Sequence, residues 1–183
     1  MNPPKAYYYC YSVEDEPLFT RMKQKIPMIT FVEGPPSKTD LETWHMAEPG
    51  EKILVLDDMM SAVTRDEFGM DLFTTYAHHY NFFTILISQN AFLQSKNYRT
   101  VSLNTSYMFI FSCSRDLSQL QCLGRQIFPN QVKYFMDAYK KATAKKYGYL
   151  LIDLSPHSDP QYKLRSNILP GQLMTVYLPE KTP

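Results

Sequence analysis

The chain has 183 residues, 44% of them hydrophobic, and a formal net charge of +1. That length suits one domain with a sizeable core, and the near-neutral charge gives the whole molecule no basis for tight nonspecific nucleic-acid binding. Three cysteines, Cys10, Cys113 and Cys122, have no metal-ligand spacing. They favour reduced thiols in cytosol or nucleus, or simply small buried residues, over a disulfide framework.

A targeting or membrane-spanning segment is not recognisable in the sequence. Residues 1–5 carry no apolar signal-peptide core, and no apolar run approaches the roughly 20 residues of a membrane span. We therefore expect a soluble intracellular protein, nuclear or cytoplasmic.

Apolar blocks alternate with helical patterns along the chain. The patterns predict strands at 6–11, 28–32, 53–56, 82–87, 107–111, 149–154 and 164–169. They predict helices at 14–25, from 38 to near 44, at 59–80 with a break near Gly69, at 118–127 and at 132–146. Strands separated by helices predict a single α/β domain with a mainly parallel sheet and helices on both faces, followed by a tail at 171–183.

The segment Lys52-Ile53-Leu54-Val55-Leu56 ends in two adjacent carboxylates, Asp57 and Asp58. An apolar run of this kind is typical of a strand buried on both faces, and parallel sheets place their ligands at the carboxyl ends of the strands. Mg²⁺ takes one or two carboxylates plus phosphate oxygens, as on the Walker B strand of a P-loop NTPase. The alternative is that an aspartate here caps the next helix.

A second polar signal follows the strand at 82–87, which continues into Ser88, Gln89 and Asn90. If this strand lies beside the Asp57 strand, Gln89 comes out at the same sheet edge and is placed to contact a γ-phosphate or its attacking water. The alternative, favoured when this signal is taken alone, is that these residues form a turn and a cap.

No phosphate-binding loop of the form G-x-x-x-x-G-K-[ST] occurs in the sequence. Other charged residues are open to two interpretations. Arg99, Arg115 and Arg125 flank predicted core strands and are candidates for stabilising charge in a neighbouring subunit's phosphate site, or for surface ion pairs. The adjacent histidines His78 and His79 diverge on a helix and are expected to be structural or surface residues rather than metal ligands.

Several motifs in fixed order resemble one family. They are ILVLDDMM at 53–60, LFT at 72–74 with AHHYN at 77–81, ISQNAF at 87–92, RTVSLN at 99–104, RDLSQL at 115–120 and YGYLLIDL at 147–154. Together they are similar to the FtsK/HerA-type viral genome-packaging ATPases of adintoviruses and Polinton (Maverick) elements. The resemblance extends from the first strand to about Pro170.

This resemblance implies a RecA-like P-loop domain that works as a ring of identical subunits, pumps double-stranded DNA into a capsid, and uses Mg²⁺ and ATP. It makes Asp57 the acid that holds Mg²⁺ through water, Asp58 the catalytic acid and Gln89 the polar sensor. It makes Arg99, Arg115 and Arg125 the candidates for the arginine finger.

The departure from the family is the strand, P-loop and helix with which such ATPases begin. The chain is expected to start just after that unit, so it lacks the phosphate cradle and a central strand expected beside the Asp57 strand. Without cations to neutralise the triphosphate, the aspartates would repel ATP, and unpaired strand edges would need covering by another chain.

Three functional classes follow. The first is a fragment or degenerate copy of a packaging ATPase that cannot hydrolyse ATP by itself. The second is a noncatalytic module that co-assembles with a protein partner through its exposed sheet edge. The third, ranked last, is a two-metal nuclease or integrase that would use Asp57 together with Asp153.

Overall fold

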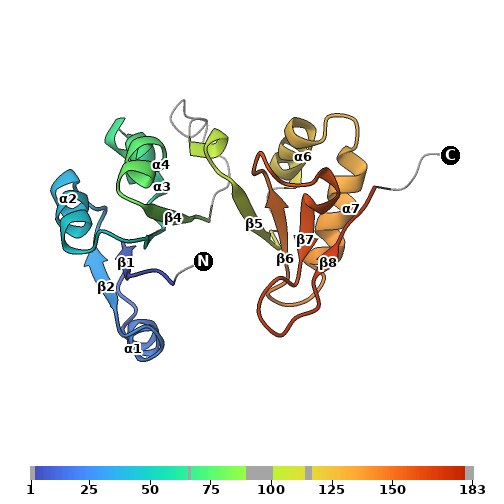
Figure 1. Cartoon of the computed structure of the whole chain (residues 1–183). Helices are drawn as coiled ribbons and strands as arrows, with labels where there is room; N and C mark the ends of the chain where they lie inside the picture. The colour runs from blue at the N-terminus through green and yellow to red at the C-terminus, as the bar shows by residue number, and fades with distance from the viewer. Residues whose placement is uncertain (1–2, 66, 90–100, 114–116, 180–183) are drawn as a thin grey trace. The chain divides into compact units, whose positions relative to one another are not determined.

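The computed structural model describes residues 3–65, 67–89, 101–113 and 117–179. Contacts divide the chain into two compact units, Met1–Asn104 and Thr105–Pro183, which we call unit 1 and unit 2. Each unit has its own sheet and its own helices (Figure 1). Among the described residues, no helix has both the length and the apolar character that crossing a bilayer requires.

Unit 1 alternates strands and helices as the sequence predicts. Its elements are β1 (Ala6–Tyr11), α1 (Glu16–Lys25), β2 (Ile29–Glu33), α2 (Lys38–Ala47), β3 (Lys52–Asp57), α3 (Met60–Arg65), α4 (Glu67–His79) and β4 (Phe82–Ile87). The strands form one parallel sheet in the order β2-β1-β3-β4. The predicted α/β class with a parallel sheet is confirmed for this unit.

The strand order corrects the expectation that a central strand is missing from beside the strand that carries Asp57. β3 pairs along its whole length with β1 on one side and with β4 on the other. The strand that carries Asp57 therefore has no free edge for a further central strand beside it. The free edges of this sheet, within the described residues, belong to β2 and β4.

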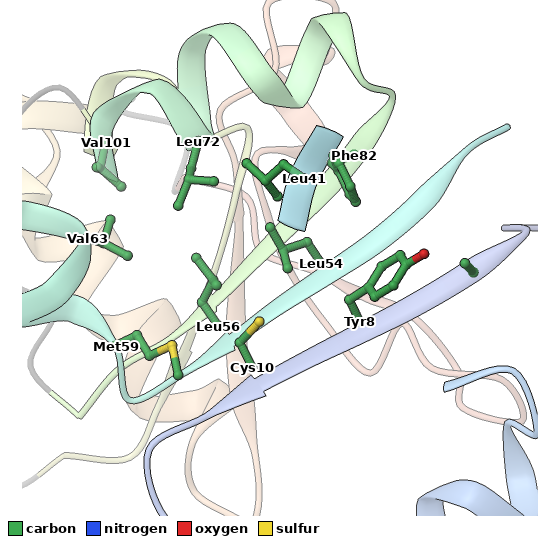
Figure 2. Packing of buried hydrophobic residues seen from close by; sticks show 11 residues of the cluster. Tyr8, Cys10, Leu41, Leu54, Leu56, Met59, Val63, Leu72, Phe82 and Val101 are labelled. Carbon is green, nitrogen blue, oxygen red and sulfur yellow. The ribbon is translucent and has the colours of Figure 1, made fainter. Parts of the chain in front are cut away.

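The two faces of the parallel sheet carry separate apolar clusters. On one face α2, α3 and α4 cover the sheet, and their residues Leu41, Val63 and Leu72 pack against Leu54 and Leu56 of β3 (Figure 2). On the other face Phe19 of α1 packs against Tyr9 and Ile29. Strand alternation explains this division, because successive side chains point to opposite faces.

Coverage of the second face does not extend to β4. Phe83, Ile85 and Ile87 are 58%, 37% and 46% exposed, whereas Phe82 on the opposite face is buried. The strand predicted at 82–87 is present. The prediction that it is buried is wrong for the side chains on this face. β4 is therefore an edge strand with exposed apolar side chains.

Local signals fix the helix ends of unit 1. Ser37 caps α2 in a reciprocal capping box with Asp40, as predicted from the Ser37 cap. The predicted break in the long helical pattern falls before Glu67, so Gly69 lies inside α4. A Cβ at Gly69 would approach the Val63 carbonyl oxygen to 1.9 Å, so only glycine permits this contact between α3 and α4.

Unit 2 has a different sheet. Its elements are β5 (Tyr107–Phe111), α6 (Leu117–Ile127), α7 (Val132–Ala142), β6 (Tyr149–Asp153), a 3₁₀ turn (Pro160–Tyr162), β7 (Leu164–Ser166) and β8 (Thr175–Val176). The strands pair in the order β5-β6-β7-β8, and every pairing is antiparallel. The predicted elements are found, but the expectation that they extend one parallel sheet is wrong. The predicted tail also contains a strand, because β8 pairs with β7.

Candidate functional site

Asp57 is the last residue of β3 and is half-buried on the face that α1 covers in part. Its carboxylate oxygen Oδ2 accepts a hydrogen bond of 2.5 Å from the hydroxyl of Tyr9. Tyr9 lies on the neighbouring strand β1, two residues before Tyr11, which is in register with Asp57. The carboxylate is therefore held in one position at the carboxyl edge of the sheet.

Asp58 leaves the extended conformation. Its φ angle is 54°, in the left-handed region, and its side chain is exposed. Its backbone N–H donates to the Ile87 carbonyl oxygen at 3.0 Å, which ties the end of β3 to the end of β4. No hydrogen bond joins either aspartate side chain to α3 among the described residues, so the helix-cap alternative is not what the structure shows.

Gln89 comes out at the same edge. Ile87, the last residue of β4, is in register with Asp57, and Gln89 follows it by two residues with an exposed side chain. The expectation that the 82–87 strand lies beside the Asp57 strand is confirmed. Asp57, Asp58 and Gln89 therefore leave the sheet at the carboxyl ends of adjacent parallel strands.

A surface hollow of about 600 Å³ adjoins Asp57, lined by that residue and by residues 13–19. This lining includes three further acids, Glu14, Asp15 and Glu16, and no basic side chain. Asp15 also accepts a hydrogen bond of 3.0 Å from the Leu18 amide and caps α1. The surroundings of Asp57 are therefore strongly negative.

Sequence reasoning did not identify Tyr9 or these three acids as part of the edge. The available signal was that residues 12–16 follow β1, as Asp58 follows β3. Both segments emerge at one edge once the two strands are parallel neighbours.

The side chains at this edge carry oxygen donors of the kind that a hard cation accepts. One or two carboxylates plus an amide oxygen are donors that Mg²⁺ accepts, with phosphate oxygens and water completing the shell. The same edge does not fit a triphosphate, because no cation or phosphate loop lines the hollow. Among the residues that the structure describes, no group of three or more His, Cys, Asp or Glu side chains is arranged to hold a metal.

The arginine candidates are not brought to this edge by any described contact. Arg99 and Arg115 lie outside the described residues. Arg125 is an exposed residue of α6 in unit 2, and its Nη1 atom lies 3.8 Å from the Cys122 sulfur. His78 and His79 are both exposed at the end of α4, which is the surface position of the two that the sequence left open.

Asp153, the second acid of the nuclease alternative, has a structural role in unit 2. It is 5% exposed, forms an ion pair with Arg165 and accepts a hydrogen bond of 3.1 Å from the Ser155 amide. Burial alone would raise the pKa of Asp153, but hydrogen bonds from Ser155 and Ser158 and the charge of Arg165 hold it below its usual value. Asp57 and Asp153 belong to different units, and no described contact joins them.

The three cysteines differ in burial. Cys10 is fully buried in unit 1, and burial, with a smaller contribution from the charge of Asp40, raises its pKa to about 12. Cys113 is half-buried and Cys122 is exposed, and all three cysteines are free thiols. This agrees with the expectation of unpaired cysteines.

Comparison of the chain with protein-family models, with curated proteins and with solved structures finds no match.

Proposed function

We propose that this chain supplies the acidic half of a magnesium-nucleotide site of the viral DNA-packaging ATPase type, and that it does not hydrolyse ATP by itself. The observation that carries the proposal is the placement of Asp57, Asp58 and Gln89 at the carboxyl ends of two adjacent parallel strands, with no phosphate-binding loop in the sequence. In such a site Asp57 would hold Mg²⁺ through water, Asp58 would orient the attacking water and Gln89 would contact the γ-phosphate.

Electrostatics supports the second part of the proposal. A triphosphate placed at this edge would meet Asp57 together with the acids of the adjoining hollow. Each pair of like unit charges 4 Å apart costs about 1 kcal/mol in water and about 4 kcal/mol near a protein surface. Bound Mg²⁺ would offset only part of this repulsion, so turnover needs a phosphate loop and a cationic side chain from another polypeptide segment.

The family assignment has a direct test in the gene. We expect the transcript and the genomic DNA upstream of Met1 to encode, in frame, a strand followed by G-x-x-x-x-G-K-[ST]. With this unit in frame the chain would be a fragment of a packaging ATPase, and with stop codons there it would be a degenerate copy whose aspartates no longer serve catalysis. An unrelated in-frame sequence would contradict the packaging-ATPase assignment. Within the proposal, double-stranded DNA and further copies of the same subunit are the partners.

A second candidate function is a noncatalytic interaction module, favoured by the exposed edge strand β4. The pairing of the Lys52 and Asp58 amides with the Asn81 and Ile87 carbonyls places the odd-numbered residues of β4 against β3. The even-numbered residues Phe82, Thr84 and Leu86 then present their backbone groups to the free edge. Residues 82–87 contain no charge and no proline, so the edge suits an added strand.

The module candidate is tested first with a second copy of the chain as the partner. Sedimentation velocity over a range of protein concentrations should reveal association that Ile85→Lys weakens. Met46→Lys, at an 81% exposed position on α2, is the matched control and should leave association unchanged. A wild-type chain that stays monomeric at every concentration would contradict pairing of two copies through β4.

A further inference from the structure

The connection between β7 and β8 of unit 2 carries large apolar side chains that are open to solvent; both strands are labelled in Figure 1. Of the 18 large hydrophobic side chains that are exposed among the described residues, five fall within residues 168–178. They are Ile168, Leu169, Leu173, Met174 and Leu178. Single exposed hydrophobic residues are ordinary, whereas a group of them marks an interaction surface. We call residues 167–174 the apolar loop.

A turn of defined geometry gives the apolar loop its shape. Pro170 and Gly171 occupy the two central positions of this turn, and the Gln172 amide donates to the Leu169 carbonyl at 3.0 Å. Gly171 has a φ angle of 82°. Proline at the first central position and a positive φ at the second are the features of a type II turn. The loop therefore presents its apolar side chains from a defined backbone.

The apolar loop is also tied to the sheet of unit 2. The Ile168 amide donates to the Tyr149 hydroxyl at 2.9 Å, and Tyr149 is a buried residue of β6. The Asn167 side chain donates through Nδ2 to the Thr175 hydroxyl at 3.2 Å, which joins the ends of β7 and β8. The loop is therefore anchored at both ends, although Leu173 is 91% exposed.

Backbone amides of the apolar loop are satisfied within the chain. The amides of Ile168 and Gln172 have the partners given above, and the Leu169 amide donates to Oε1 of the Gln172 side chain at 3.3 Å. Pro170 has no amide hydrogen to satisfy. Transfer of an N–H group to an apolar medium is costly where the group loses its hydrogen bond. These residues can leave water without that loss.

A lipid surface suits this composition better than a groove on another protein does. Residues 166–179 contain no charged side chain, and the two side-chain amides of the loop, Asn167 and Gln172, already form hydrogen bonds within the chain. Protein interfaces carry about one hydrogen bond per 100–200 Å² and are anchored by Trp, Tyr or Arg. Residues 167–174 contain none of these three residue types. Insertion at a bilayer surface requires only apolar side chains on an exposed segment.

The charge of unit 2 suits an anionic lipid surface. Ten of the 19 lysines and arginines but only five of the 18 aspartates and glutamates lie in unit 2, which gives it a formal charge of +5. In the turn before Tyr149, Tyr147 is 80% exposed and the Lys146 ammonium lies 5.0 Å from its ring centre. Tyrosine is enriched at the headgroup level of membranes, where lysine is attracted to anionic lipids.

We propose that the apolar loop inserts into the surface of a lipid bilayer and holds the chain there reversibly. Ile168, Leu169, Leu173 and Met174 would enter the boundary between headgroups and acyl chains, and the positive charge of unit 2 would add attraction to anionic lipids. A single myristoyl chain binds membranes with a constant of about 10⁴ M⁻¹, and four side chains at the surface should bind no more tightly. The proposal is carried by unit 2 and does not depend on the nucleotide site proposed for unit 1.

Flotation of the 183-residue chain with lipid vesicles tests the proposal. The probes are extruded vesicles of phosphatidylcholine alone and of phosphatidylcholine with about 30% phosphatidylserine, each at low and at physiological salt. The chain should float with both vesicles, with an association constant of about 10³ to 10⁴ M⁻¹ in accessible lipid. Phosphatidylserine should strengthen binding about fivefold at low salt and less at physiological salt, because salt screens the attraction.

Paired variants locate the contact with lipid. Leu173→Ser with Met174→Ser should weaken flotation roughly tenfold on both kinds of vesicle. Val13→Ser with Met46→Ser removes two apolar side chains of unit 1 that are 79% and 81% exposed, and it should leave flotation unchanged. All four positions are exposed, so both double variants should keep the circular dichroism of wild type.

A fluorescence measurement shows whether the loop itself enters the bilayer. Leu173→Trp places an indole at the most exposed position of the apolar loop. Its emission should shift to shorter wavelength on addition of vesicles and should be quenched by lipids with brominated acyl chains. Trp44 stacks on Tyr8 in unit 1 and supplies the background, which should not be quenched in wild type.

Three results would overturn the proposal. The first is no flotation with either vesicle at about 5 mM lipid, which would leave an apolar groove on a protein as the partner of the loop. The second is equal weakening by the Leu173 and Met174 pair and by the Val13 and Met46 pair. The third is flotation with anionic vesicles alone and no quenching of the added indole, which would assign binding to charge and leave the loop in water.

Discussion

The hydroxyl of Tyr9 donates a hydrogen bond of 2.5 Å to Oδ2 of Asp57, and this contact joins β1 to the carboxyl end of β3. Burial, the hydrogen bond to Asp57 and the negative charges of Asp57 and Asp15 all raise the pKa of Tyr9, so its hydroxyl stays protonated. The donor therefore remains available to Asp57 over the whole physiological pH range. It fixes one of the two acids on which the proposed function depends.

Replacing Tyr9 by Phe removes this donor and leaves the ring packing in place. A partly buried hydrogen bond to an acidic group predicts a loss of about 1 to 2 kcal/mol in the free energy of unfolding of unit 1. Urea unfolding followed by the fluorescence of Trp44, the single tryptophan, which stacks on Tyr8 in unit 1, measures it.

The matched control is Tyr7→Phe on the same face of β1. The Tyr7 hydroxyl makes no hydrogen bond within the described residues, so its removal should change stability by less than about 0.5 kcal/mol. Equal losses in the two variants would show that the contact between Tyr9 and Asp57 contributes nothing.

Gly69→Ala should destabilise unit 1 although alanine is the better helix former. In an unhindered helix this exchange gains about 1 kcal/mol. Here the new Cβ would lie 1.9 Å from the Val63 carbonyl oxygen, so α3 must move, and we expect a net loss of about 2 to 4 kcal/mol. Trp44 fluorescence in urea measures the change, with Thr75→Ala at an exposed position of α4 as the control. A stabilised Gly69→Ala variant would refute the close contact between α3 and α4.

Lys52 makes the stability of unit 1 depend on pH in a defined direction. Its side chain is fully buried, and its ammonium donates to the Glu48 and Gly50 carbonyls at 2.7 and 2.8 Å. Burial lowers the pKa of Lys52 below 10.5, although the charge of Glu48 opposes this. The unfolded chain therefore binds more protons between the folded pKa and 10.5, and stability rises with pH in that window.

The comparison that isolates Lys52 is wild type against Lys52→Met at pH 7, 8.5 and 10. The stability of wild type minus that of the variant should increase as pH rises, because tyrosine ionisation affects both proteins alike. Lys25→Met, at an exposed position, should show a constant difference. If the stability of wild type minus that of Lys52→Met fell as pH rose, the burial of a charged Lys52 would be contradicted.

Asp153→Asn should destabilise unit 2, because it leaves the positive charge of Arg165 without its partner. We expect a loss of about 2 kcal/mol at pH 7, less than for a fully buried pair because Arg165 is partly exposed. The pKa of folded Asp153 lies below 3.8, so this contribution is present above pH 3.8 and is lost as pH falls through the folded pKa.

Hydrogen exchange of the β6 amides, followed by mass spectrometry, measures this effect within unit 2. Asp137→Asn on the exposed face of α7 is the control and should leave β6 protection unchanged. Unchanged protection in Asp153→Asn would mean that the ion pair with Arg165 contributes nothing to unit 2.

Periodicity was enough to locate the strands and helices, and its failures have physical causes. A single helix between two strands returns the chain to the starting edge, and β1 and β2, which α1 connects, are parallel as predicted. Two helices separate β3 from β4 and two separate β5 from β6, yet the first pair of strands is parallel and the second is antiparallel. The sequence pattern therefore predicts how many helices lie between two strands. It does not predict how each helix packs, and so it does not predict the direction of the next strand.

The candidate site was predictable in part for a similar reason. Asp57, Asp58 and Gln89 follow apolar strands, so their shared edge follows once those strands pair in parallel. Tyr9 lies within an aromatic strand and looks like a core residue. Its contact with Asp57 depends on the register between β1 and β3, which the sequence does not specify.

The central claim is that the edge formed by Asp57, Asp58 and Gln89 lacks the cationic half of a nucleotide site. Isothermal titration of the 183-residue chain with Mg-ATP, beside its Asp57→Asn and Asp58→Asn variants, tests this most directly. The account predicts no saturable binding up to about 1 mM nucleotide in any of the three proteins. Any binding would then have a favourable free energy of at most about 4 kcal/mol. Micromolar binding by wild type that Asp57→Asn abolishes would contradict it.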